Sequence, residues 1–334
     1  MKELTNLTTV NDKKLLVVLP IKTINDIFLN EISFSISQQT QPIDVLVLCA
    51  DNNSDENIAR LKSILDKPII TIPEKETPDG PVTQKTIEAT NKINYVVENI
   101  KSDANFQFIF NESLNYAIGN QYEFFSVIEP EDVLDSNWYN TVLKYASKKS
   151  AIDGFMPIMK EVSNGNFLGF FNEACWVDGY AEVAGTFDLQ LLMRFNCVNI
   201  TGAVFKTESL KTYGVEVTPG DFKVLKENFK LSFAYEFFLR MIYDDLKFFT
   251  IPRLGYEHRI DVPVSNIDPF SSKVPRNLSS WPEEKGGMTQ EEIKFWNDSA
   301  KKEYFIARHD RKVEYKKREA VSVATPVPTM NVVQ

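Results

Sequence analysis

The chain has 334 residues, of which 43% are hydrophobic and 12% aromatic, so it can bury a full core in one large domain or two modest ones. Its 37 Lys and Arg face 46 Asp and Glu, a formal net charge of -9. That balance argues against general nucleic-acid binding, because neutralised phosphates supply most of that affinity.

Secretion and membrane insertion are not expected either. No stretch approaches the roughly 18 apolar residues of a membrane span, and residues 1–11 lack the apolar segment of a signal peptide. The three cysteines, Cys49, Cys175 and Cys197, show no metal-type spacing and fit a reducing compartment. We therefore expect a cytoplasmic protein.

The first third of the chain alternates strand-like and helix-like segments. Leu15–Leu19 and Val45–Cys49 are continuous apolar runs, which is typical of parallel strands buried on both faces. Apolar residues recur at helical spacing between Ile27 and Ile36, and a second helix is expected over Asp55–Leu65. This βαβ pattern predicts a mostly parallel sheet with right-handed crossovers.

The next segments predict a third layer of the same kind. Ile69–Ile72 is expected to be a short strand, followed by a loop rich in proline. Apolar spacing then predicts helices over Thr83–Ile100 and Asn111–Ile118, before a buried strand over Phe124–Ile128.

The second half is less regular. Gly165–Gly185 is expected to form strands and loops, Ser232–Tyr243 a helix and Phe248–Ile251 a strand, which together would form the acceptor-side wall of a cleft. Thr289 and Glu292 have capping-box spacing at the start of a further helix.

The C-terminal part combines a basic segment with an uncharged tail. Residues 301–318 hold eight basic and three acidic side chains, which indicates either a solvated helix face or a surface that docks a protein partner or an anionic surface. Residues 320–334 carry no charge and are expected to be a flexible tail.

Chemistry is most strongly indicated by Glu129, Glu131 and Asp132, which follow the Phe124–Ile128 strand directly. A strand that ends in alternate carboxylates is a natural seat for a divalent cation and the phosphates bound to it. The alternative is a solvated loop before a helix that Asp135 or Ser136 caps.

At these residues the chain resembles the family-two nucleotide-sugar glycosyltransferases. The matches follow one another in order over residues 14–145: Pro20 after the first strand; Ser35, Ile36, Gln39 and Thr40; Asp51, Ser54 and Asp55; Asn111, Ser113, Leu114 and Ala117; and Glu129 to Asp132. Later matches are Tyr235–Glu236 with Leu239–Arg240, and Tyr256 with His258. Each match alone is short, and their common order carries the resemblance.

The resemblance implies a glycosyltransferase A fold, a Rossmann-like α/β domain over 1–265 with a nucleotide-sugar half (14–145) and an acceptor half (146–265). A C-terminal helical extension would cover 266–319 and the tail 320–334. It implies Mn²⁺ or Mg²⁺ held by Glu131 and His258, nucleotide contacts from Asp51, Asn111 and Glu129, and Glu236 as the catalytic base. The expected partners are a nucleotide sugar and a glycan or protein acceptor.

Several positions depart from the family pattern. Glu stands where Asp is usual at Glu129, Glu131 and Glu236, and Phe110 stands where an arginine is usual. A misplacement of about 1 Å in a reacting group can cost about a hundredfold in rate. A second hypothesis is therefore a catalytically inactive structural or interaction component of a large assembly such as a virion. A nucleotidyltransferase is disfavoured because no glycine-rich phosphate loop follows the first strand.

Overall fold

The computed structural model describes residues 14–50, 53–73, 84–163, 165–178, 181–188, 191, 200–223, 237–238, 241–242 and 244–259. The expected C-terminal helical extension, the basic segment and the tail lie outside these residues.

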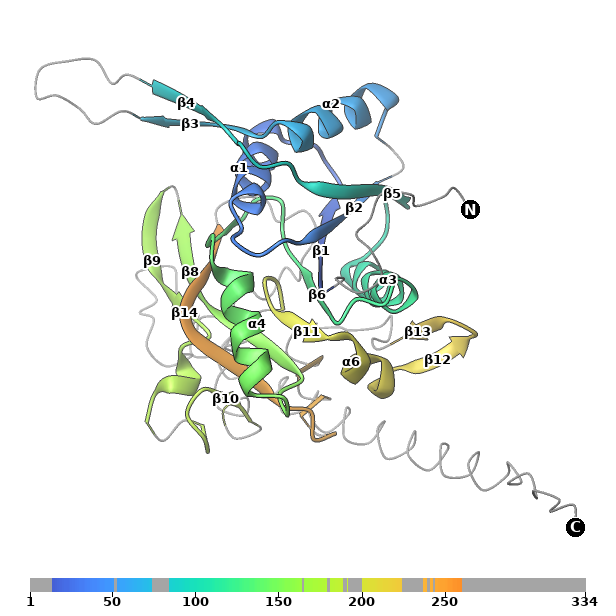
Figure 1. Cartoon of the computed structure of the whole chain (residues 1–334), viewed down its shortest axis with the longest axis vertical. Coiled ribbons are helices and arrows are strands. Elements are labelled where there is room, and N and C mark those ends of the chain that lie inside the picture. The colour runs from blue at the N-terminus through green and yellow to red at the C-terminus, as the bar shows by residue number, and fades with distance from the viewer. Residues whose placement is uncertain are drawn as a thin grey trace, which may run out of the picture.

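The protein has a mixed α/β fold in which helices flank a curled central sheet (Figure 1). Four parallel strands form one part of this sheet, in the order β5–β2–β1–β6: β5 (Asn94–Ile100), β2 (Asp44–Ala50), β1 (Leu15–Ile21) and β6 (Phe124–Val127). The expectation of an α/β fold with a central sheet is confirmed.

The sheet continues beyond β6 with strands from the second half of the chain. β11 (Val204–Lys206) is antiparallel to both β6 and β8 (Gly154–Ser163), and β14 (Phe248–Arg259) runs parallel to β8. Three shorter additions are antiparallel: β7 (Val133–Leu134) and β10 (Thr186–Phe187) pair with β14, and β9 (Asn166–Phe171) pairs with β8. One sheet thus joins the two predicted halves.

Side-chain caps begin three of the helices. Asn25 accepts a hydrogen bond from Ile27 N–H at the start of α1 (Asp26–Ser37), Ser54 caps α2 (Asp55–Asp66), and Asn105 caps α3 (Phe106–Gly119). Further helices within the described residues include α4 (Trp138–Lys148), α6 (Thr207–Tyr213) and the 3₁₀ turn η1 (Ala174–Trp176). The first two helices and the one before β6 were expected, and they are confirmed.

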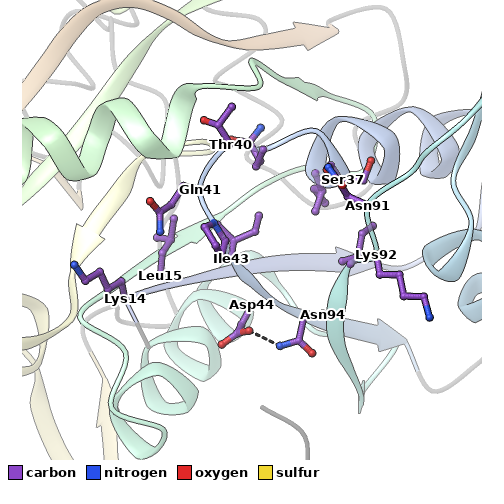
Figure 2. Close-up of a pocket in the computed structure, with 14 residues that line it drawn as sticks. Lys14, Leu15, Ser37, Thr40, Gln41, Ile43, Asp44, Asn91, Lys92 and Asn94 are labelled. Atoms are coloured by element: carbon purple, nitrogen blue, oxygen red, sulfur yellow. Dashed lines mark hydrogen bonds between the residues drawn. The ribbon is translucent and has the colours of Figure 1, made fainter. Parts of the chain in front are cut away.

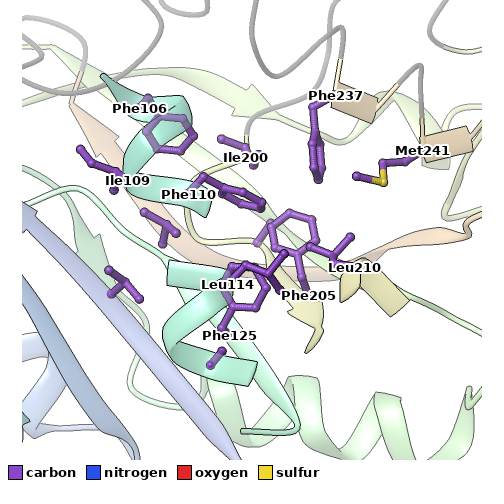
Figure 3. Close-up of a cluster of buried hydrophobic side chains, with 14 of the residues drawn as sticks. Phe106, Ile109, Phe110, Leu114, Phe125, Ile200, Phe205, Leu210, Phe237 and Met241 are labelled. Carbon is purple, nitrogen blue, oxygen red and sulfur yellow. The ribbon is translucent and has the colours of Figure 1, made fainter. Parts of the chain in front are cut away.

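Alternate residues of the central strands supply two hydrophobic cores, one on each face of the sheet. In β1, Leu16 and Val18 join the core that lies against α3 and α6, whereas Leu15, Val17 and Leu19 join the core against α1, α2 and α4. Figure 3 shows the first core, where aromatic rings from α3, β6 and β11 meet. Burial on both faces explains the continuous apolar runs of β1 and β2.

The helix predicted over Thr83–Ile100 is wrong. This segment forms two strands, β4 (Gln84–Glu88) and β5. β5 gains the full ladder of backbone hydrogen bonds along β2, and Asn94 donates a hydrogen bond to Asp44 at its start. β5 lies at the edge of the sheet as described, and its side chains are half-exposed. Its sequence therefore lacks the continuous apolar run found in β1.

The strand predicted at Ile69–Ile72 exists, but outside the central sheet. β3 (Ile69–Pro73) pairs only with β4 among the described residues, and the two form an antiparallel hairpin. In Figure 1 this hairpin projects from the upper left of the molecule. The expected third βα unit is therefore incomplete, because β5 and not β3 is the strand that pairs with β2 in the central sheet.

The strand order reverses at β1. The chain runs from β1 to β2 and β5 on one side and then returns to β6 on the other side of β1. In open α/β sheets, ligands bind at the carboxyl ends of the strands where such a reversal occurs. The residues that follow β1 and β6 lie at this edge.

Candidate functional site

The carboxylates after β6 are buried, so they do not form a solvated loop. Glu129 and Asp132 are each 1% exposed, and Glu131 between them is half-buried. The segment leaves the sheet where Ile128 N–H donates to the carbonyl of Val18 in β1. It then pairs with β14 through the two residues of β7. Buried acidic groups are retained only where other groups hold them.

β14 brings Tyr256 and His258 against these carboxylates. The two residues alternate with Glu257, so their side chains point to one face of the sheet while Glu257 points to the other, where it pairs with Lys160 at 2.7 Å. Tyr256 is 2% exposed and its hydroxyl accepts a hydrogen bond of 3.0 Å from the backbone N–H of Glu129. Burial and the negative charge of Asp132 raise the pKa of Tyr256 far above its ordinary value.

His258 lies directly on Asp132. The imidazole Nδ1 is 3.1 Å from Oδ1 and 3.0 Å from Oδ2, and the backbone N–H of Arg259 donates to Oδ1 at 3.0 Å. With Nδ1–H donating to the carboxylate, Nε2 is the ring nitrogen that remains to accept a proton or a cation. The side chain of Arg259 extends in turn to Glu31 of α1.

The charges of this cluster act on the titration of His258. Burial lowers the pKa of the imidazole, but the charge of Asp132, its hydrogen bond and the charge of Glu131 together raise that pKa above its ordinary value. Glu131 is therefore close enough to His258 to influence its protonation. The sequence predicted these two residues as a ligand pair, and the structure brings them into one cluster.

The loops after β1 and β2 are tied together at the same edge. The side-chain amide of Asn53 donates to the carbonyl of Ala50 at 2.9 Å and to that of Lys22 at 3.4 Å. Asp51, the predicted nucleotide contact, precedes Asn53 but lies outside the described residues.

The other predicted site residues have separate outcomes. Asn111 is buried in the middle of α3. Its nucleotide contact stays a prediction. Glu236 lies outside the described residues, although Phe237 and Phe238 after it are helical and buried. Phe110 is fully buried among Phe125, Phe205 and Phe237, so this position belongs to the core (Figure 3).

Two cluster residues could hold a divalent cation. Among the described residues, no group of three or more His, Cys, Asp and Glu side chains has metal-binding geometry. Asp132 is held by His258 and by the backbone N–H of Arg259, and the candidate ligands are Glu131 and His258 Nε2. This set fits Mg²⁺ or Mn²⁺ of the kind that one or two protein groups hold together with substrate phosphates.

A pocket of about 690 Å³ lies at the opposite edge of the sheet (Figure 2). It is lined by residues at the amino ends of the strands, including Leu15 of β1, Asp44 of β2 and Asn94 of β5. Asp44 is held there by Asn94 and by the hydroxyl of Tyr122 at 2.8 Å. None of the acidic cluster lines this pocket, so the two features are separate.

Comparisons with known proteins find only distant similarity. No protein-family model matches the chain, and no curated protein matches it significantly. Among solved structures, S. aureus TarS 1–349 is 16% identical, with a TM-score of 0.49 over 74% of this chain and 60% of that chain. The complex of TarS 1–349 with UDP-GlcNAc also gives 0.49, and a longer TarS structure gives 0.47 over 36% of its length. The chain therefore spans less than two thirds of these proteins.

Among the described residues, no helix is both long and apolar enough to cross a bilayer.

Sequence reasoning missed two contributors to the cluster. Gly202, just before β11, has φ +70°, and its carbonyl accepts a hydrogen bond of 3.0 Å from the indole of Trp138. A Cβ at Gly202 would lie 2.7 Å from the ring of Tyr256. Arg259 supplies the backbone N–H to Asp132. The only sequence signal for Gly202 is the glycine itself.

Proposed function

We propose that this chain is a metal-dependent, inverting glycosyltransferase that uses a nucleotide-sugar donor. The observation that carries the proposal is the meeting of Glu131 and Asp132 with His258 at the carboxyl edge beside the β1–β6 reversal. That edge is where α/β sheets bind nucleotides. The ordered matches to family-two glycosyltransferases support the same assignment.

Glu131 and His258 Nε2 would bind a divalent cation together with the donor diphosphate. When bound, Mn²⁺ or Mg²⁺ neutralises charge that develops on the leaving diphosphate. Asp132 would keep His258 in the tautomer whose Nε2 is available. Glu129 would contact the ribose from its buried position after β6, and Asp51 would contact the base.

The transfer itself needs an acceptor hydroxyl and a base. The acceptor oxygen forms a bond to the anomeric carbon as the bond from that carbon to the phosphate oxygen breaks. The nucleoside diphosphate leaves with the electron pair, and Glu236 takes the proton of the acceptor hydroxyl. Attack from the face opposite the leaving group inverts the anomeric centre.

Binding of the donor is the direct test. The thermal unfolding of the full chain would be followed with UDP- and GDP-sugars, including UDP-GlcNAc, each with and without Mn²⁺. A donor at one hundred times its Kd stabilises the folded chain by about 2.7 kcal/mol. We expect this only with the cation present, and we expect Glu131→Gln to abolish it.

Glu257→Gln is the matched control, because Glu257 is adjacent to His258 but points to the other face of the sheet. It should bind the donor as the wild type does. A wild-type chain that binds no donor of the panel with either Mn²⁺ or Mg²⁺ would contradict the proposal and favour the non-catalytic alternative.

A further inference from the structure

The hydroxyl of Tyr256 holds the start of the carboxylate segment. It accepts a hydrogen bond of 3.0 Å from the backbone N–H of Glu129. The end of the segment is held by the same strand, because Asp132 lies 3.0 Å from His258 Nδ1 and accepts from the backbone N–H of Arg259. Glu131 lies within the segment that these bonds hold.

Tyr256 itself is fixed on its other side. The ring lies against the backbone of Gly202, where a Cβ would come within 2.7 Å of Cδ2. Gly202 is held by a hydrogen bond of 2.9 Å from its N–H to the carbonyl of Val127 and by the indole of Trp138. The ring is thus confined between the end of β6 and the residues that precede β11.

We propose that Tyr256 is a positioning residue that sets the conformation of the 129–132 segment, and that Gly202 is required because only glycine leaves room for the ring. The inference rests on the proposed function for its donor-binding readout. Its physical basis is that a buried hydroxyl bonded to the first residue of a four-residue segment, whose last residue is held by His258 and Arg259, removes conformational freedom from the residues between them.

Tyr256→Phe removes the hydroxyl and keeps the ring. Tyr139→Phe is a matched control, because Tyr139 is equally buried in the same core cluster. Within the described residues, the Tyr139 hydroxyl makes no hydrogen bond to the 129–132 segment. We expect Tyr256→Phe to weaken donor binding by about 10- to 100-fold, the usual effect of removing a group that orients a metal ligand. Tyr139→Phe should change it by less than about threefold.

Amide hydrogen exchange gives a readout that needs no donor. A peptide covering residues 124–134 should exchange faster in Tyr256→Phe than in Tyr139→Phe, because Glu129 N–H loses its partner. Gly202→Ala should displace the Tyr256 ring and so weaken the same hydrogen bond to Glu129 N–H. It should therefore accelerate exchange in the same peptide. Its control is Gly220→Ala, which has a similar φ of +85° but no atom within 4 Å of the new Cβ.

The outcomes separate this inference from the proposed function. If the wild type binds a donor and Tyr256→Phe binds it as well as Tyr139→Phe, the positioning role is wrong and the function stands. If the wild type binds no donor, the function is wrong and exchange decides. Faster exchange confined to Tyr256→Phe and Gly202→Ala supports the role, and exchange equal to that of both controls overturns it.

Discussion

Asp132 and His258 are 126 residues apart in the sequence, yet both oxygens of the buried carboxylate lie within 3.1 Å of the imidazole Nδ1. The contact joins the segment after β6 to the far end of β14. It therefore links the part of the chain that resembles a nucleotide-binding half to the part expected to bind the acceptor.

Replacing Asp132 should destabilise the protein strongly. Asp132→Asn replaces one carboxylate oxygen by an NH2 group, so the side chain no longer offers both oxygens to His258 and Arg259 and loses the charge opposite the imidazole. We expect the free energy of unfolding, measured by urea denaturation, to fall by about 3 kcal/mol. Asp135→Asn affects a surface pair with Arg253 and should cost less than about 1 kcal/mol. Equal losses in the two variants would contradict the described network.

The burial of Phe110 predicts that restoring the usual family residue will fail. Phe110→Arg places a charge among Phe125, Phe205 and Phe237 and should prevent folding. Phe110→Ala should lower the free energy of unfolding by about 3–5 kcal/mol. Phe108→Ala on the same helix is the control, because Phe108 is 42% exposed and its loss should cost far less. A soluble, folded Phe110→Arg variant would refute this packing.

The fold was more predictable from the sequence than the details of its strands were. β1 and β2 are buried on both faces, so their apolar runs appear directly in the sequence. β5 has a neighbour only in β2 among the described residues, and its spaced apolar residues fit a helix as well as an edge strand. Local spacing cannot show which neighbour a strand will gain.

The candidate site was likewise predictable only in part. Glu129, Glu131 and Asp132 were visible because acidic residues directly follow a buried strand. His258 was reached only through the family resemblance, because nothing local connects it with Asp132. The roles of Tyr256 and Gly202 depend on one ring packing against one backbone, and that contact exists only after folding.

Glycine is required at position 255 for a steric reason. A Cβ at Gly255 would lie 2.5 Å from the indole of Trp138 and 2.9 Å from Cβ of Pro157. Gly255→Ala should therefore lower the free energy of unfolding by about 1–3 kcal/mol, the usual cost of overpacking a core. Gly119→Ala, where no atom lies within 4 Å, should be neutral or slightly stabilising. Thermal or urea unfolding of both variants checks the pair.

Stability should depend on pH through Glu112 of α3. Glu112 is exposed on α3, but partial loss of solvation by neighbouring groups and the charges of Asp221 and Glu98 raise the pKa of its carboxyl, which Lys223 partly opposes. The folded chain therefore binds this proton more tightly than the unfolded chain, for which the pKa is 4.5. The resulting stability is present below pH 4.5 and is lost as the pH rises through the folded value.

Glu112→Gln should consequently be more stable than the wild type at pH 7, and this advantage should shrink as the pH falls toward 4.5. Urea unfolding at a series of pH values gives the comparison, with Glu123→Gln as the control for the loss of one exposed carboxylate elsewhere on the surface. An advantage that does not change with pH would show that the carboxylate's charge is not its cause.

The central claim is that Glu131 and His258 share a cation with the diphosphate of the donor. His258 and His309 are the only histidines in the chain, so His309→Gln leaves one imidazole to follow by NMR. With UDP present, Mn²⁺ at His258 should broaden its ring signals beyond detection, whereas Mg²⁺ should leave them sharp. Sharp His258 signals in a sample that demonstrably binds Mn²⁺ and UDP would contradict the account.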